Sequence, residues 1–159
     1  MKWHLISEKN PATLGHVTRT TLAAATSLCA AILLGLPEAH WAIISTLVVT
    51  QSSFEASLSI SIQRFFGTAV GALTGTLLSS HFRWNLQIYI AAVFFIGILS
   101  ANFKLERAAY RYACITLAIV MIISQTIDPW TRALHRFIEV SLGIIVGLLL
   151  TLVWPEQKE

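Results

Sequence analysis

An Arg-Phe pair followed by two glycines four residues apart occurs twice in the chain, at an offset of 72 residues. The first copy runs from Arg64 to Gly75 and the second from Arg136 to Gly147. Each copy lies in an apolar run near the end of one half of the chain. The pattern indicates an internal duplication, although Arg-Phe with two glycines in apolar sequence is also a match that chance can produce. If the duplication is real, the two halves of the chain are copies of one unit.

Composition narrows the fold further. Hydrophobic residues make up 55% of the 159 residues and charged residues 12%, with a mean hydropathy of +0.69. Soluble domains average about 25% charged residues. The composition therefore predicts an integral membrane protein, with residues 1–159 forming one domain in a lipid bilayer. The net charge of +3 comes from scattered Lys and Arg, a pattern typical of loop charge and not of a nucleic-acid surface.

Six apolar segments predict an all-α protein with six transmembrane helices. Pro37, the Asp128-Pro129 pair and Pro155 end three of the segments, because proline cannot continue a helix and disfavours helix in the residue before it. The predicted spans are residues 17–36, 40–57, 64–80, 86–102, 110–126 and 134–154.

Loop charge predicts the orientation of these helices. Six spans place both termini on one side, and the Lys and Arg of that side outnumber those of the other, so the positive-inside rule predicts that both termini are cytoplasmic. The terminal side carries Lys2, Lys9, Arg19, Arg64, Lys104, Arg107, Arg111 and Lys158, and the opposite side carries Arg83, Arg132 and Arg136. Three spans per half is an odd number, which predicts a 3+3 inverted repeat with Arg64 near the inner face and Arg136 near the outer face.

The repeated glycines are spaced by four and therefore follow one face of each helix. Small residues on a helix face let helix backbones approach closely in lipid, so we expect a packing role for them. A backbone-lined substrate path is the less favoured interpretation. The glycines in question are Gly67, Gly71 and Gly75 in the first copy and Gly143 and Gly147 in the second.

The second span is short. Residues 41–50 are largely apolar, and at ~1.5 Å per residue they cover only about half of a hydrocarbon core. We therefore expect the helix to carry Gln51 and the serines after it below the lipid surface, where polar residues face protein or water. The alternative is an interfacial helix with Phe54, Leu58 and Ile62 in the headgroup region.

Arginines stand at the predicted helix ends, where their usual role is to reach the interface and set topology. A path for an anion also needs positive charge, and Arg recognises carboxylates with two parallel hydrogen bonds. Glu139 lies one turn after Arg136, so an ion pair within the helix is one expectation for it. Proton coupling through this membrane carboxyl is the alternative. No catalytic triad, phosphate-binding loop or cysteine cluster occurs in the sequence, so we predict no enzyme activity, no cofactor and no metal site.

The sequence resembles the fusaric acid resistance protein-like family of bacterial inner-membrane proteins, which includes the aromatic acid exporters. The resemblance covers nearly the whole chain. It is most specific from Trp41 to Gly71, where Trp-Ala, Gln-Ser and Gln-Arg-Phe-Phe-Gly-Thr-Ala-Val-Gly follow in order. It is carried further by Arg136-Phe137-Ile138-Glu139 and by Trp154-Pro155. Long members of this family add cytoplasmic domains and a second membrane unit.

The resemblance implies a multi-pass protein of the bacterial inner membrane that exports small aromatic or other organic acids, such as hydroxylated benzoates or fusaric acid. A single unit would then act as a homo-oligomer. A distant likeness to plant malate-activated anion channels keeps a passive anion channel open, and a non-transporting partner subunit of a larger exporter is the third alternative. The family signature and the charge argument together predict the residues of a substrate path. They are Trp41, Gln51, Arg64, Arg111, Arg136 and Glu139.

Overall fold

The computed structural model describes residues 14–82, 85–103, 106–123 and 128–154. Over these residues the chain forms six α-helices and no strand, so the all-α prediction is confirmed for this part of the chain. The helices are α1 (Leu14–Leu33), α2 (His40–Val49), α3 (Phe54–His81), α4 (Leu86–Asn102), α5 (Arg107–Ile123) and α6 (Pro129–Val153). The predicted loop residues Lys2, Lys9, Arg83, Lys104 and Lys158, and the end of the predicted span 110–126, lie outside the described residues.

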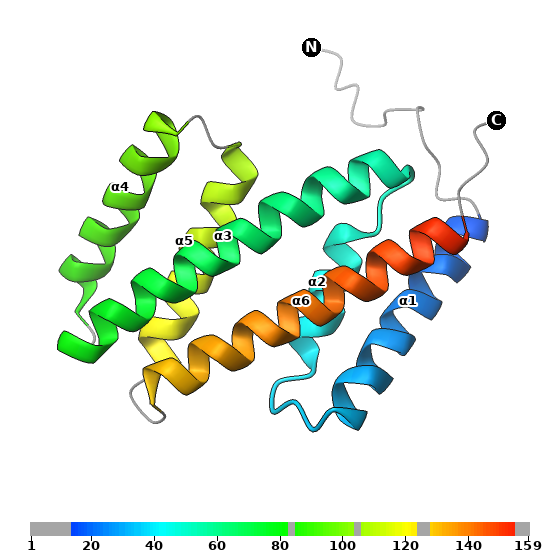
Figure 1. Ribbon diagram of the computed structural model, residues 1–159, viewed down its shortest axis with the longest axis horizontal. Coiled ribbons are helices and arrows are strands. Elements are labelled where there is room, and N and C mark those ends of the chain that lie inside the picture. Colours follow the sequence, from blue (N-terminus) through cyan, green and yellow to red (C-terminus); the bar gives the residue numbers. More distant parts are fainter. Residues whose placement is uncertain (1–13, 83–84, 104–105, 124–127, 155–159) are drawn as a thin grey trace, which may run out of the picture.

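Successive helices run in opposite directions, and α3 and α6 lie antiparallel at the centre of the bundle (Figure 1). The most extensive contacts join α3 to α5, α3 to α6 and α2 to α6. Helix α1 packs against α2 and α6, whereas α4 packs mainly against α5 at the opposite edge. The start of α1 and the end of α6 meet at the same end of the bundle, where Arg19 Nη1 donates to the Trp154 carbonyl at 3.2 Å.

The boundary between the second and third helices differs from the prediction. Helix α2 ends at Val49, and the chain is extended at Thr50 and at Ser53. The Ser53 hydroxyl caps α3 by accepting from Ala56 N at 3.2 Å, and serine is a favoured N-cap because its side chain replaces a missing helical acceptor. The expectation that Gln51 continues the second helix is therefore wrong. The segment proposed as an interfacial helix forms the first turns of the 28-residue α3.

Two other helix ends also differ, because local capping residues set them. Gly35 has φ of 66°, and the amides of Gly35 and Leu36 donate back to Ile32 and Ala31, each at 3.0 Å. This glycine C-cap ends α1 at Leu33, three residues before the predicted limit. Helix α6 begins before the predicted residue 134, because the Asp128 side chain accepts from Thr131 N and Pro129 occupies the first turn.

The glycines pack helix against helix, as the spacing predicts. A methyl group built on Gly71 would lie 2.2 Å from the Ala113 carbonyl oxygen of α5. One built on Gly143 would lie 2.3 Å from the Ala42 carbonyl oxygen of α2. Each glycine therefore lets its helix touch the backbone of a neighbour, which no larger residue allows.

The contacts of the two halves recur at constant offsets. Gly71 lies against Ala113 and Thr116, and Gly143 against Ala42 and Ser45. Gly75 lies against Leu117 and Val120, and Gly147 against Thr46 and Val49. In every case the α6 residue is 72 positions after its α3 counterpart, and the α5 residue is 71 positions after its α2 counterpart. Phe65 and Phe137, also 72 apart, meet with ring centroids 5.0 Å apart where α3 crosses α6.

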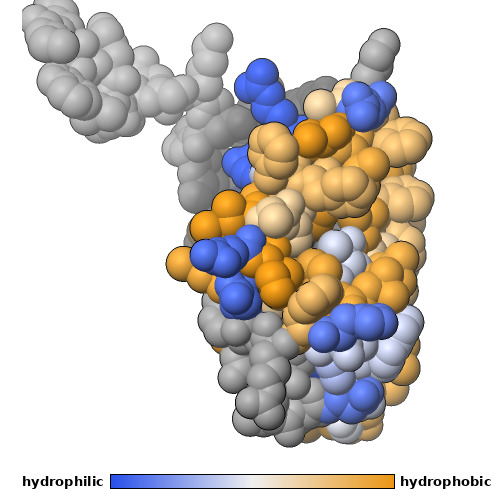
Figure 2. Space-filling view, turned by 90° about the vertical axis from the view of Figure 1, so that its left-hand side faces the viewer, coloured by the Kyte–Doolittle hydropathy of each residue, from blue (hydrophilic) through white to orange (hydrophobic). Residues whose placement is uncertain are grey.

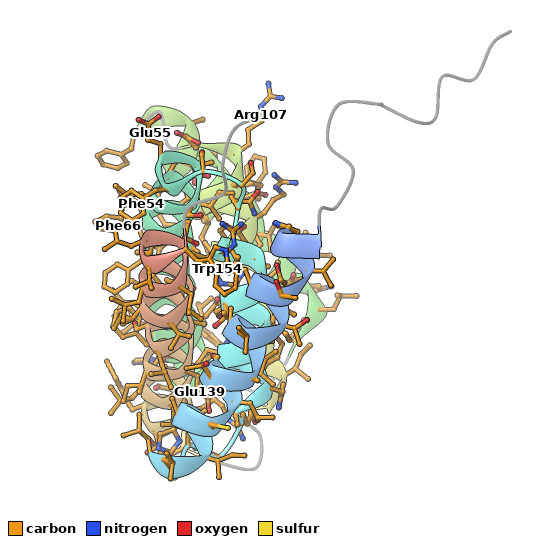
Figure 3. All side chains as sticks on the ribbon, turned by 90° about the vertical axis from the view of Figure 1, so that its right-hand side faces the viewer. Phe54, Glu55, Phe66, Arg107, Glu139 and Trp154 are labelled. Atoms are coloured by element: carbon orange, nitrogen blue, oxygen red, sulfur yellow. The ribbon has the colours of Figure 1, made fainter. Side chains whose placement is uncertain are left out.

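The outside of the bundle is apolar. Figure 2 shows hydrophobic residues over much of the α4 side, and Phe94, Phe95 and Phe103 are among the exposed side chains there. Phe54 and Phe66 point away from the bundle in Figure 3, whereas Glu55 and Arg107 stand at one end. Among the described helices, α6 is long and apolar enough to cross a membrane, and α2 and α4 are shorter apolar helices.

Candidate functional site

Charged side chains gather inside the bundle where α2, α3, α5 and α6 approach one another. Arg64 is 5% exposed, Arg136 2% and Glu139 1%. Glu139 lies among the helices in Figure 3. The neighbouring Phe65 and Phe137 are in ring contact, so the two arginines belong to turns that meet at the helix crossing. Both arginines point into the bundle, Arg64 from the third turn of α3 and Arg136 from the second turn of α6. That Arg64 lies nearer the inner face of the membrane and Arg136 nearer the outer face stays a prediction.

Arg136 is held by an aromatic ring. Its guanidinium carbon lies 3.5 Å from the centroid of the Trp41 ring, a close cation–π contact. Its Nε and Nη1 atoms are buried and have no hydrogen-bond partner among the described residues. Buried donors nearly always find acceptors, so two unsatisfied nitrogens on one guanidinium indicate a place where an acceptor is expected.

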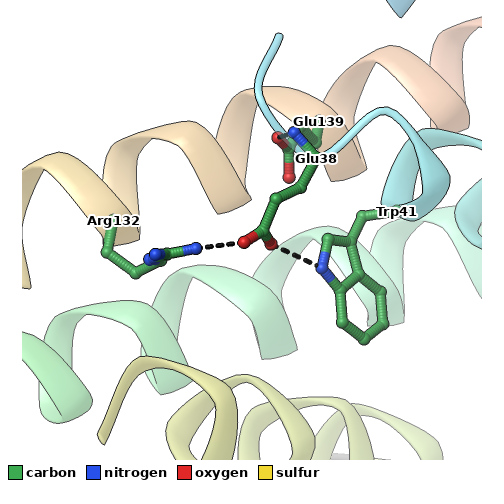
Figure 4. Close-up of polar contacts among 4 residues, drawn as sticks. All are labelled: Glu38, Trp41, Arg132 and Glu139. Carbon is green, nitrogen blue, oxygen red and sulfur yellow. Dashed lines mark hydrogen bonds and ion pairs between the residues drawn. The ribbon is translucent and has the colours of Figure 1, made fainter. Parts of the chain in front are cut away.

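Glu38, in the loop between α1 and α2, connects three elements (Figure 4). Its carboxylate forms an ion pair with Arg132 of α6 and accepts from Trp41 Nε1 at 2.8 Å. Its backbone amide donates to Glu139 Oε1 at 2.9 Å. This network fixes the Trp41 ring beneath Arg136 and joins the α1–α2 loop to α6.

Glu139 forms no direct ion pair with Arg136, which was one of the two expectations for it. Both residues are described, and no ion pair forms between them; Glu139 is bonded to the Glu38 amide instead. The second carboxylate oxygen, Oε2, is buried without a hydrogen-bond partner among the described residues.

Arg64 has a parallel environment. Its Nε and Nη2 donate to the Ser45 hydroxyl at 3.2 and 3.1 Å, and its guanidinium lies 5.0 Å from the centroid of the Tyr112 ring. Ser45 in turn donates to the Trp41 carbonyl at 2.8 Å. The two arginines are therefore linked through one turn of α2.

The cluster carries an excess of positive charge. Among the described residues that form it, three guanidinium groups face two carboxylates when all are ionised; they are Arg64, Arg132 and Arg136 against Glu38 and Glu139. Burying an uncompensated charge is costly unless a partner is supplied. A small anion is the partner that this balance and the unsatisfied donors would accept.

Two predicted path residues lie elsewhere. The Gln51 carbonyl accepts from Arg19 Nη2 at 2.8 Å, and its amide donates to Ser57 Oγ at 3.0 Å, so Gln51 joins helix ends. Arg111 is exposed on α5 and makes none of the contacts of the cluster. Within the described residues no group of His, Cys, Asp and Glu side chains could hold a metal ion.

Sequence reasoning missed Ser45 and Tyr112 at the site, and it assigned Glu38 and Arg132 no role in a substrate path. Glu38 and Arg132 lie just outside the predicted spans 40–57 and 134–154, and Ser45 is a lone serine in a short apolar run. A signal for Tyr112 did exist, because the segment after it repeats the segment after Trp41.

A helical bundle with an apolar exterior and charged side chains gathered inside has the organisation of a helical membrane protein, in which the apolar surface faces lipid. The chain belongs to the fusaric acid resistance protein-like family, which is matched over residues 22–150. Membership of this family places the chain in a membrane.

Curated relatives cover most of the chain. An uncharacterized transporter, YdhK of Escherichia coli K12, is 27% identical over 156 residues, which is 91% of this chain and 23% of the relative. The YdhK protein of Salmonella typhimurium LT2 is 26% identical over 156 residues, again 91% of this chain and 22% of the relative. The chain thus spans less than a quarter of the length of these relatives. No solved structure matches the chain.

Proposed function

We propose that this chain is a transport unit for small organic anions, acting in the bacterial inner membrane as an oligomer and exporting aromatic or other organic acids. Its six helices would cross the membrane with both termini in the cytoplasm. The common end of α1 and α6, and the alternating helix directions, support this topology. The relatives described as transporters support the class of function.

One observation carries the proposal: Arg136 is 2% exposed and keeps two buried N–H groups without acceptors. A hydrogen bond to a charged group contributes about 1.5–3 kcal/mol. A carboxylate that used both donors would therefore contribute enough to hold a weakly bound substrate against loss to water. The aromatic ring of Trp41 adds a flat apolar surface beside the charge, which suits an aromatic acid.

The driving force that we propose is the proton gradient, because no nucleotide-binding motif occurs in this sequence. The test is flux of labelled 4-hydroxybenzoate, and of fusaric acid as a second probe, in proteoliposomes with an imposed pH gradient. Arg136→Gln is expected to lower flux at least tenfold, whereas Arg107→Gln, an equal charge change at an exposed position, leaves it unchanged. Absence of flux from correctly inserted wild-type protein would overturn the proposal.

A second candidate is supported by the lengths of the relatives. The chain covers 23% of YdhK. If the transport path needs parts that this chain does not hold, the chain is a partner subunit of a larger exporter. This candidate predicts that the purified chain moves nothing and that a second protein co-purifies with it in equal amount. Steady unitary currents in planar bilayers, without saturable flux, would instead identify a passive anion channel.

A further inference from the structure

The two buried arginines occupy matching places in the two halves of the chain. Arg64 of α3 lies over Tyr112 of α5, with 5.0 Å from guanidinium carbon to ring centroid. Arg136 of α6 lies over Trp41 of α2, with 3.5 Å between the same points. The arginines are 72 positions apart and the rings 71 positions apart. These are the offsets that relate the glycine contacts of the two halves.

The match extends to the residues beside each arginine. A methyl group on Gly67 would meet the Ala109 carbonyl at 2.4 Å, and at the corresponding place Glu139 accepts from the Glu38 amide. Phe65 and Phe137 correspond to each other and touch, which is the behaviour of residues next to a two-fold axis. Because α3 and α6 are antiparallel, such an axis turns one half upside down relative to the other.

We propose that Arg64 with Tyr112 and Arg136 with Trp41 are two quasi-equivalent binding subsites for the carboxylate of one small organic anion, which passes from one to the other during transport. The proposal rests on the function proposed above and names the residues that bind the substrate. The internal two-fold relation then supplies one subsite for each side of the membrane.

The chemistry of each subsite suits a carboxylate. A guanidinium whose face rests on a ring keeps its N–H groups directed outward from its edge, which is the geometry of carboxylate recognition. At Arg136 the Nε and Nη1 donors have no partner among the described residues. At Arg64 two donors share one neutral oxygen, Ser45 Oγ. A carboxylate is a stronger acceptor than a hydroxyl and would replace it.

The subsites are also mechanically connected. Ser45 accepts from Arg64 and donates to the carbonyl of Trp41, whose ring supports Arg136. An anion that binds Arg64 would release the Ser45 hydroxyl. Ser45 lies on the same turn of α2 as Trp41, the ring of the second subsite.

The experiment measures both equilibrium binding and flux of labelled 4-hydroxybenzoate, with the purified full chain in liposomes. Arg64→Gln and Arg136→Gln are each expected to weaken binding by about tenfold to a hundredfold and to reduce flux to background, because transfer needs both subsites. Arg107→Gln serves as the matched control and is expected to bind and transport as wild type. If either arginine can be replaced with binding and flux unchanged, the two-subsite assignment is wrong.

Two further pairs of variants test the equivalence and keep the proposal testable if the Gln variants do not fold. Trp41→Tyr and Tyr112→Trp convert each ring to the type found in the other half and are expected to retain flux within about threefold, since both rings support a cation. Trp41→Leu and Tyr112→Leu remove the ring and are expected to lose binding by about tenfold. Equal behaviour of Tyr112→Leu and wild type would remove Arg64 and Tyr112 from the site.

The outcomes separate this inference from the proposed function. Wild-type flux that survives Arg64→Gln overturns the second subsite and leaves the transport function standing. Binding that depends on both arginines, without flux in wild type, overturns transport by the isolated chain and supports the subsites. A wild-type chain that neither binds nor transports the probes overturns both.

Discussion

The glycine contacts predict how much each glycine-to-alanine substitution destabilises the fold. At Gly71 the added methyl carbon would lie 2.2 Å from the Ala113 carbonyl oxygen, whereas ordinary contact begins at 3.4 Å. The obstructing atom belongs to the backbone, so α3 and α5 must separate by about an ångström to accept the methyl group. Gly143→Ala meets the same obstacle at the Ala42 carbonyl oxygen of α2.

The expected size follows from two opposing effects. Overpacking of a tight contact costs about 1–3 kcal/mol, and a backbone obstacle favours the upper end of that range. Alanine gains up to about 1 kcal/mol over glycine in helix propensity. The net destabilisation of Gly71→Ala is thus about 2 kcal/mol, or roughly thirtyfold in the folding equilibrium.

Gly97 provides the matched control. It lies in α4, and a methyl group there would have its nearest neighbour, an atom of the Tyr110 ring, at an ordinary 3.5 Å. Gly97→Ala is therefore expected to be neutral or stabilising by up to about 1 kcal/mol. The assay is unfolding in mixed detergent micelles followed by circular dichroism. A Gly71→Ala chain as stable as Gly97→Ala would show that α3 and α5 are not in backbone contact.

Three further predictions concern the polar contacts. Glu38→Gln and Arg132→Gln are each expected to cost about 2 kcal/mol in the same unfolding assay, because each leaves a charge unpaired, buried at Arg132 and half-buried at Glu38. The double variant should cost less than the sum of the two, and additive losses would show that the pair is not coupled. Arg19→Ala is expected to cost about 2 kcal/mol, since two helix-end carbonyls, Gln51 and Trp154, lose a charged donor, and Arg19→Lys should recover part of it. Glu139→Gln keeps an oxygen for the Glu38 amide but removes a negative charge beside the arginines, so 4-hydroxybenzoate should bind more tightly in an equilibrium titration; weaker binding would mean that the carboxylate helps to hold the anion.

Much of the fold follows from the sequence, because apolar runs and prolines report helices and their ends directly. The errors in the predicted helix ends occur where a capping residue sets the end of the helix. Ser53 offers α3 an N-cap and thereby ends the preceding helix at Val49, an effect that hydropathy does not record. Gly35 ends α1 before Pro37 for the same kind of reason.

The site was harder to predict because a charged side chain in an apolar helix can point in either of two directions. Arg64 and Arg136 could reach outward to the interface or turn inward onto an aromatic ring, and the difference depends on which side of the helix the neighbouring helix lies. Composition and loop charge favour the outward direction. The structure has the inward one, since Tyr112 and Trp41 each supply a ring at the point where the guanidinium lies.

The duplication shows why the partner rings stayed hidden. A single offset of 72 aligns α3 with α6, but it misaligns α2 with α5 by one residue, which separates every matching pair there. At an offset of 71 the segment from Trp41 matches that from Tyr112, with Ala42, Ile44 and Val49 recurring as Ala113, Ile115 and Val120.

The second half therefore holds one more residue than the first between these paired helices, in the stretch from Val120 to Arg136. Helix contacts depend on the faces of whole helices and tolerate such an insertion in a connection, so both halves keep their packing while the sequence repeat breaks. An arginine over an aromatic ring in each half is what the two copies still share. The carboxyl of Glu139, at the position of Gly67, is what distinguishes them.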